Sequence, residues 1–377
     1  MSEMVFDNAR LVLPDGVVTG ALAVRDGRIA AVGDGRARGE DLEGDYLLPG
    51  LIELHTDFLE GCYLPRPKVK WNPVAAVLSH DAQVAAAGIT TVFDALRVGD
   101  DADSANVGED AMILAGAVSS ALESDMTRAD HLLHIRCELS ADNAADEFGR
   151  MAENPRIRLV SLMDHTPGQR QFTDLEQFRI YYGGKTGWSS EKLEAFITDR
   201  QERGARVAPS NRRRIVKQAR DMGLALASHD DATAEHVEEA IADGVAIAEF
   251  PTREEAARAS HGHGMKVLMG APNVVRGGSH SGNIAAADLA RLGLLDILSS
   301  DYIPYSLLQA AFDLPNRAPE MSLADAVRTV TTNPAEATGL DDRGRIEAGK
   351  RADLVRVRLV DGLPVVRGVW REGRRVA

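Results

Sequence analysis

Short apolar runs alternate with amphipathic segments through the middle of the chain. The runs cover residues 51–55, 89–95, 131–139, 157–164, 224–229, 245–251, 265–271 and 294–301. Runs that are apolar almost throughout predict parallel strands buried on both faces of a sheet. Most of them precede a segment with helical spacing of its apolar residues, for example 74–87, 233–242 and 253–261. Eight such βα units predict an α/β fold, a closed (β/α)₈ TIM barrel, in preference to an open doubly wound sheet.

The two ends of the chain have a different pattern, in which short β-like stretches are separated by turns. Such stretches cover residues 4–13, 20–25 and 29–32 near the start, and 354–360 and 365–371 near the end. Asp-Gly and Glu-Gly pairs between them are typical turn signals. We therefore predict a small β-sandwich domain built from both termini, residues 1–50 and 345–377, and a barrel domain over residues 51–344.

Side chains that can bind metal ions stand at the ends of several predicted strands. They are His55, Asp57, Glu138, His165, His229 and Asp301. Taken singly, such a His is more often structural, and such an Asp more often caps a helix. The carboxyl ends of barrel strands converge on one mouth, however, so we expect the six to meet there. Imidazole and carboxylate ligands predict one or two divalent ions, with Zn²⁺ preferred and Mg²⁺ or Mn²⁺ as alternatives.

Basic and glycine-rich segments fall in the loops that follow the same strands. The candidate phosphate-binding residues are Arg66, Lys68, Arg170, Lys185, Arg276 and His280. Arginine suits bidentate contact with phosphate oxygens, and glycines let backbone N–H groups approach an anion. The alternative for these loops is a solvated turn without a ligand. We interpret Arg212–Arg214 as surface charge at the start of a helix, and His80 as a structural residue on the first barrel helix.

The overall charge narrows the range of partners. The chain of 377 residues has a formal net charge of −14, which argues against binding to nucleic acid or an anionic membrane. A small anionic substrate requires the locally basic loops just described. Two cysteines and no apolar stretch of membrane-spanning length predict a cytoplasmic enzyme. A homodimer is compatible with the sequence but not indicated by it.

Several motifs resemble those of the amidohydrolase superfamily. They are the run Leu48-Pro49-Gly50-Leu51-Ile52-Glu53-Leu54-His55, the run from Ala87 to Val92, and Thr332-Asn333-Pro334-Ala335 followed by Ala352-Asp353-Leu354-Val355. The resemblance implies a metal-dependent hydrolase on a TIM barrel. The usual His-x-His pair is His55-Thr56-Asp57 here, no Lys ends the fourth strand, and the sixth strand offers Glu249 where a His is usual. These departures imply a more oxygen-rich site and leave the ligand set open, with Glu138 as a candidate bridge.

The whole chain resembles one branch of this superfamily, which acts in phosphonate catabolism. That resemblance implies hydrolysis of a ribose 5-triphosphate to the 5-monophosphate and pyrophosphate, and neither spacing nor composition indicates this reaction. We expect Asp301 to accept the proton of the attacking water. Two alternatives remain open. One is an amidohydrolase that opens a cyclic amide or deaminates its substrate, and the other is a barrel that has lost its metal and serves as a scaffold.

Overall fold

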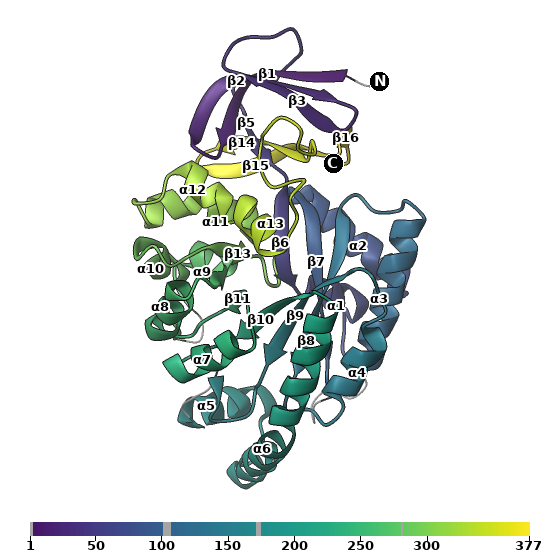
Figure 1. Cartoon of the computed structure of the whole chain (residues 1–377), viewed down its shortest axis with the longest axis vertical. Coiled ribbons are helices and arrows are strands. Elements are labelled where there is room, and N and C mark those ends of the chain that lie inside the picture. The colour runs from purple at the N-terminus through teal and green to yellow at the C-terminus, as the bar shows by residue number, and fades with distance from the viewer. Residues whose placement is uncertain (1–2, 101–106, 171–174, 280–281) are drawn as a thin grey trace. The chain divides into compact units, whose positions relative to one another are not determined.

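The computed structural model describes residues 3–100, 107–170, 175–279 and 282–377 (Figure 1). Eight parallel strands form one sheet in chain order. They are β6 (Leu51–Thr56), β7 (Ile89–Val98), β8 (Asp130–Glu138), β9 (Ile157–Met163), β10 (Ala225–His229), β11 (Ile247–Glu249), β12 (Lys266–Gly270) and β13 (Ile297–Ser299). Each overlaps one of the eight predicted strands, so the predicted barrel sheet is confirmed.

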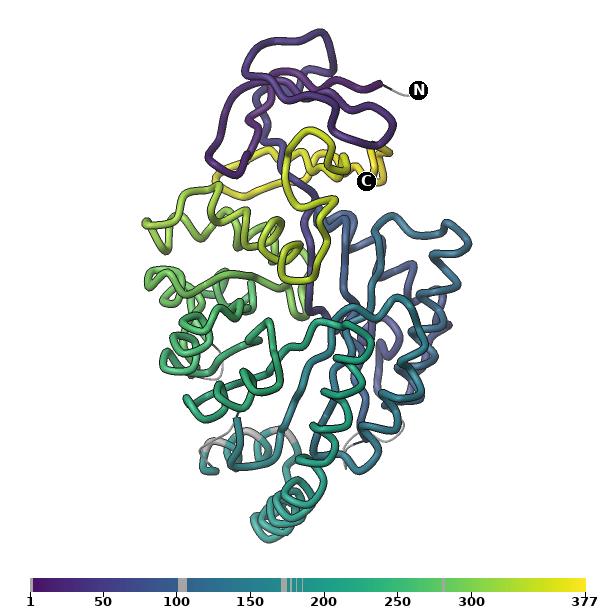
Figure 2. The backbone as a smooth tube through the Cα atoms, in the orientation of Figure 1, coloured from purple at the N-terminus to yellow at the C-terminus, as the bar shows by residue number. Residues whose placement is uncertain are grey.

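A second sheet combines strands from both ends of the chain. Its strands are β1 (Glu3–Leu13), β2 (Gly16–Arg25), β3 (Arg28–Gly33), β4 (Glu40–Asp41), β5 (Tyr46–Pro49), β14 (Leu354–Val360), β15 (Leu363–Arg371) and β16 (Arg374–Arg375). β14 pairs antiparallel with both β5 and β15, so the C-terminal hairpin extends the N-terminal sheet. Figure 2 shows the purple and yellow ends of the chain side by side in this sheet. The predicted β domain from both termini is confirmed, and its boundaries stay a prediction.

Helices follow most of the barrel strands, as the pattern predicts. They are α1 (Phe58–Tyr63), α2 (Pro73–Ala86), α3 (Val107–Glu123), α4 (Ala144–Met151), α5 (Leu175–Thr186), α6 (Ser190–Asp221), α7 (Ala234–Ala242), α8 (Glu254–Gly262), α9 (Ala271–Arg276), α10 (Ala286–Arg291), α11 (Ser306–Arg317), α12 (Leu323–Arg328) and α13 (Thr332–Ala337). Their starts are set by local chemistry. The Asn72 side chain accepts a hydrogen bond from Ala75 N, with Pro73 opening α2, and Thr233 caps α7 in the same way. None of the helices within the described ranges is long and apolar enough to cross a bilayer.

The chain divides into two compact units, and the barrel strands are shared between them. The first unit comprises Met1–Ala95, Ala117–Leu132 and Leu268–Ala377, and the second comprises Leu96–Gly116 and Leu133–Val267. In the first unit the terminal sheet has its own core, in which Phe6 meets Trp370 edge to face at 4.8 Å between ring centroids. In the second, Phe178, Leu193 and Ile197 form a core between α5 and α6.

Candidate metal centre

Three predicted ligands of the first unit are joined through their backbones. Asp301 N donates to His55 O and Asp57 N donates to Asp301 O, both at 3.2 Å, and the Thr56 hydroxyl donates to Asp301 O at 2.7 Å. Asp301 has a left-handed backbone, with φ 58°, and comes two residues after the end of β13. This conformation is uncommon outside glycine and Asn or Asp, and it is held here by hydrogen bonds on both sides. The first unit thus brings the backbones of His55, Asp57 and Asp301 together, and their role as ligands stays a prediction.

A buried carboxyl lies directly beneath these residues on β6. Glu53 is fully buried and accepts hydrogen bonds from His55 N at 2.7 Å and Ser300 N at 2.5 Å. Burial raises the pKa of Glu53 to about 7, against the opposing effect of these donors. Glu53 therefore fixes the backbone at the ends of β6 and β13, on which His55 and Asp301 stand.

In the second unit, Glu138 at the end of β8 holds His165 after β9. Glu138 Oε2 lies 2.5 Å from His165 Nδ1, and Glu138 Oε1 accepts from His165 N at 3.1 Å and from the Ser140 hydroxyl at 2.7 Å. Burial opposes ionisation, but His165 and Arg97 outweigh it and hold the pKa of Glu138 well below its usual range. A carboxylate on Nδ1 fixes the ring and directs Nε2 outward, which is how carboxylates orient metal-binding histidines. This geometry favours an orienting role for Glu138.

The outward face of His165 meets two residues at the end of β10. His165 Nε2 lies 3.9 Å from Asp230 Oδ2, which in turn lies 3.0 Å from His229 Nδ1. Burial alone would lower the pKa of His229, but the neighbouring Asp230 carboxylate raises it. Burial alone would raise the pKa of Asp230, but His229 outweighs burial and lowers it. Asp230 also has a left-handed backbone, with φ 59°. Sequence reasoning missed this residue.

The chemistry of these three side chains fits a divalent cation. Each of His165, His229 and Asp230 offers one ligand atom, and the three atoms lie within 4.8 Å of one another. His229 and Asp230 are buried, and His165 is partly exposed. Two imidazoles and a carboxylate, held together by burial and with an orienting carboxylate behind one of them, are a typical donor set for a divalent metal ion.

Glu249, at the end of β11, also belongs to the polar interior of the second unit. It accepts a short hydrogen bond from the Ser161 hydroxyl on β9 and lies 3.9 Å from His134 Nε2 on β8. It is the register partner of His229 on the neighbouring strand. Glu249 is 1% exposed, and its neighbours Ser161 and His134 are also polar and buried. The sequence singled out Glu249 because it stands where the superfamily usually has a His.

The predicted phosphate-binding residues fall into three groups. Arg66, Lys68 and Arg276 are exposed, the first two beyond α1 and the third in the last turn of α9. Lys185 lies in α5, but its side chain is outside the described part of the structure, as is the whole of His280. Arg170 differs from all of these, because it is only 4% exposed and contacts the carboxylates of Asp231 and Glu239.

Arg212 corrects one sequence interpretation. It does not lie at a helix start, since α6 runs from Ser190 to Asp221 with Pro209 inside it. Nor is Arg212 surface charge: it is 7% exposed and contacts Glu239 at 2.9 Å and Asp243 at 2.5 Å. The proline and the run of three arginines resembled a helix boundary. The acidic partners of Arg212 come from α7 and the residue that ends it, which the local sequence does not reveal.

A second group of histidines and carboxylates lies in the first unit, between α2, β7 and β8. Asp94 accepts from His80 Nε2 at 2.7 Å and from His131 Nδ1 at 2.8 Å, and Asp81 lies 3.4 Å from His131 Nε2. All four are buried. The spacings are those of hydrogen bonds, so we interpret this group as a structural network, in agreement with the role predicted for His80.

Comparison with known proteins agrees with this fold. The model of an amidohydrolase family matches residues 82–377. The chain is 48% identical to the α-D-ribose 1-methylphosphonate 5-triphosphate diphosphatase of Escherichia coli strain K12, over 99% of this chain and 100% of that one.

Solved structures at low identity share the architecture. A 5-methylcytosine deaminase from Klebsiella pneumoniae matches with a TM-score of 0.66 at 15% identity, covering 99% of this chain and 98% of that one. An N-acetylglucosamine-6-phosphate deacetylase from Thermotoga maritima matches with a TM-score of 0.62 at 16% identity, covering 99% of each chain. The family model and the full-length relative together establish that this chain belongs to the amidohydrolase family.

Proposed function

We propose that this chain is a metal-dependent diphosphatase that hydrolyses α-D-ribose 1-methylphosphonate 5-triphosphate to the 5-monophosphate and pyrophosphate. The observation that carries the proposal is the 48% identity, over the full length of both chains, to the Escherichia coli enzyme of that name. The cluster of His165, His229 and Asp230 supports it independently, because it offers the donors that a metal-dependent hydrolase needs.

The proposed ligands in the second unit are His165, His229 and Asp230. In the first unit, the candidate ligands are His55, Asp57 and Asp301. All eight barrel strands run parallel in one sheet, so we expect residues beyond their carboxyl ends at one edge. A divalent ion, Zn²⁺ by preference, supplies a Lewis acid for the phosphoryl oxygens and lowers the pKa of a bound water from about 15.7 towards 7.

The protein's own groups have distinct proposed tasks. Glu138, which stays ionised, accepts the Nδ1 proton of His165 in a hydrogen bond and leaves its Nε2 available as a ligand atom. Asp301 accepts the proton of the attacking water and later delivers it to the leaving pyrophosphate. Its carboxylate is held in place because its backbone is tied to His55 and Thr56.

The triphosphate requires cations in an acidic protein. Arg66, Lys68 and Arg276 are the described candidates, because each is exposed and follows a barrel strand. Positive groups at that edge would offset the repulsion that a net charge of −14 exerts on the substrate. Their contribution during the reaction is to stabilise negative charge that develops on the departing pyrophosphate.

The test is phosphorus NMR of products formed in ¹⁸O-labelled water, with and without added divalent ions. The ribosyl triphosphate should yield pyrophosphate and a ribose 5-monophosphate that carries the label, because attack at the α-phosphorus expels pyrophosphate. Orthophosphate as the first product, or label in the pyrophosphate, would contradict this chemistry. Ammonia release from cyclic amides or aminated bases, measured in parallel, would support the amidohydrolase alternative instead.

A further inference from the structure

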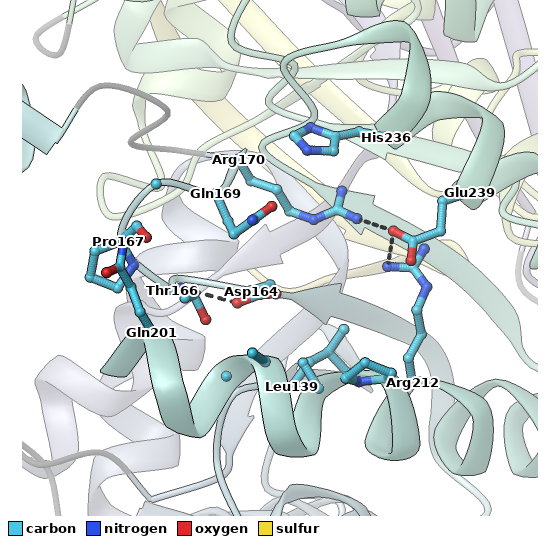
Figure 3. Close-up of a pocket in the computed structure, with 15 residues that line it drawn as sticks. Leu139, Asp164, Thr166, Pro167, Gln169, Arg170, Gln201, Arg212, His236 and Glu239 are labelled. Carbon is cyan, nitrogen blue, oxygen red and sulfur yellow. Dashed lines mark hydrogen bonds and ion pairs between the residues drawn. The ribbon is translucent and has the colours of Figure 1, made fainter. Parts of the chain in front are cut away.

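Residues 164–170, which follow β9, present two faces. His165 turns towards Glu138 and Asp230, while its neighbours Asp164 and Thr166 line a cavity of about 400 Å³ on the other side. α6 and α7 complete the wall of this cavity (Figure 3). The placement of His165 therefore depends on what anchors the segment 164–170 against these two helices.

Arg170 is the charged anchor of that segment. Figure 3 shows its guanidinium directed towards Glu239 on α7, at 2.6 Å, and it also makes a short ion pair with Asp231. Asp231 directly follows Asp230 and comes two residues after His229. One ion pair thus joins the segment that carries His165 to the segment that carries the other two candidate ligands.

Two hydrogen bonds hold the same segment without reaching the end of β10. Gln201 Nε2 donates to Pro167 O at 3.0 Å, and Thr166 N donates to Asp164 Oδ1 at 3.0 Å. Arg212 occupies the far side of Glu239 without contacting Asp231. Among these contacts, the Arg170–Asp231 pair is the one that sets one ligand segment against the other.

The surroundings of Arg170 argue against its predicted role as a phosphate ligand. Its guanidinium is 5% exposed and faces two carboxylates, so it brings no net positive charge to a substrate. If Arg170 moved away to contact a phosphate, Asp231, which is 1% exposed, would remain as a buried charge without its ion-pair partner. Such a charge is strongly unfavourable. The backbone of Arg170 is left-handed, with φ 37°, a conformation that is retained only where the surroundings enforce it.

We propose that Arg170 is a positioning residue, which through Asp231 fixes His165 relative to His229 and Asp230. The proposal rests on the proposed function only in assuming that these three side chains bind a metal ion. The fork-shaped guanidinium suits a site with two carboxylate partners, so Lys at this position would not reproduce it.

The experiment compares Arg170→Met, Arg170→Lys and Asp231→Asn with Arg212→Met as the matched control. Arg212 is similarly buried, lines the same cavity and shares Glu239, but has no contact with Asp231. Zinc affinity of the purified metal-free proteins is measured by competition with a chromophoric chelator. We expect a loss of about 10- to 100-fold in all three test variants, as for other residues that orient ligands, and less than about 2-fold in the control.

Two further readouts separate this role from the alternatives. The losses of zinc affinity in Arg170→Met and Asp231→Asn should not add in the double variant, because both substitutions remove the same Arg170–Asp231 ion pair. Amide hydrogen exchange over residues 164–170, measured without metal, should accelerate in the test variants but not in Arg212→Met. Unchanged zinc affinity with a raised KM in Arg170→Met would overturn the proposal in favour of phosphate binding.

The hydrogen-exchange arm does not depend on activity or metal. If no triphosphate is hydrolysed but exchange and zinc affinity change as expected, the proposed function fails and the positioning role stands. If exchange over residues 164–170 is the same in wild type and all variants, the positioning role fails whatever the enzyme hydrolyses.

Discussion

Replacing Asp94 by Asn should destabilise the protein in a manner that depends on pH. Asp94 is fully buried between His80 and His131 and accepts a hydrogen bond from each. Burial disfavours its charge, but the two histidines outweigh burial and lower the pKa of Asp94 from 3.8 to about 2. Burial alone would lower the pKa of His131, but the carboxylates of Asp94 and Asp81 outweigh burial and raise it from 6.5 to about 9.

The size of the effect follows from these shifts. At 1.36 kcal/mol per unit, the Asp94 shift corresponds to roughly 2 kcal/mol and the His131 shift to roughly 3 kcal/mol. Both largely describe one ion pair, so they are counted once, as about 3 kcal/mol. For 377 residues the unfolding entropy is about 0.8 kcal/mol per kelvin, and the expected loss in melting temperature is therefore about 4 °C.

The pH dependence has a definite sign. The contribution of His131 is fully present below pH 6.5 and is lost as pH rises through about 9, because the folded state binds that proton more tightly. The contribution of Asp94 is present above pH 3.8 and is lost as pH falls through about 2. The loss in melting temperature caused by Asp94→Asn should therefore be largest between about pH 4 and 6.5 and smallest above pH 9.

Thermal unfolding at pH 5.5, 7.5 and 9.5 measures the effect. The exposed Asp15→Asn variant, in the turn between β1 and β2, controls for loss of one negative charge. An equal loss in melting temperature at pH 5.5 and 9.5 would show that the charge of His131 is not the cause. No loss at any pH would refute the interpretation of this group as a structural network.

Four further predictions concern the candidate site. Asp301→Asn should lower kcat far more than it raises KM, and steady-state kinetics with unchanged kcat would rule out its role as proton acceptor. Chelation should abolish hydrolysis, with recovery on adding Zn²⁺, Mn²⁺ or Mg²⁺ in an order that identifies the preferred ion; full activity after exhaustive chelation would contradict a metal-dependent reaction. Glu138→Gln should weaken zinc affinity by about 10- to 100-fold through loss of the charge that orients His165, as a chelator titration would detect. Gly204→Ala places a Cβ against the Thr166 hydroxyl and should cost about 1–3 kcal/mol in a denaturant titration, whereas Gly262→Ala, with no atom within 4 Å of an added Cβ, is the control.

The barrel was predictable from sequence because its strands are buried on both faces. A strand such as β7 has buried residues at almost every position, so it stands out as a continuous apolar run. The terminal sheet was predictable for another reason, since Asp-Gly turns mark its hairpins on both ends of the chain. That the two ends pair through β5 and β14 is a long-range contact, which the sequence suggested only by the similarity of their patterns.

The site was less predictable where the backbone departs from regular geometry. Alternation along an extended chain would point Asp230 away from the side to which His229 points. A left-handed backbone at Asp230 breaks that alternation and brings its carboxylate within reach of both His229 and His165. The available signal was chemical rather than periodic, because Asp is among the few residues that adopt this conformation readily after a strand.

The two units hold their candidate ligands by different physical means. In the first, backbone hydrogen bonds and β-bridge pairing tie Asp301 to the His55 segment, so the arrangement depends on peptide groups whose charge never changes. In the second, side-chain contacts do the same task, with Glu138 on His165 and Arg170 on Asp231. Periodicity and strand order can reveal the first kind of support, since it follows from sheet pairing. The second kind joins residues far apart in sequence through charge, which explains why strand-end reasoning selected His165 as a candidate ligand but did not reveal the ion pair between Arg170 and Asp231.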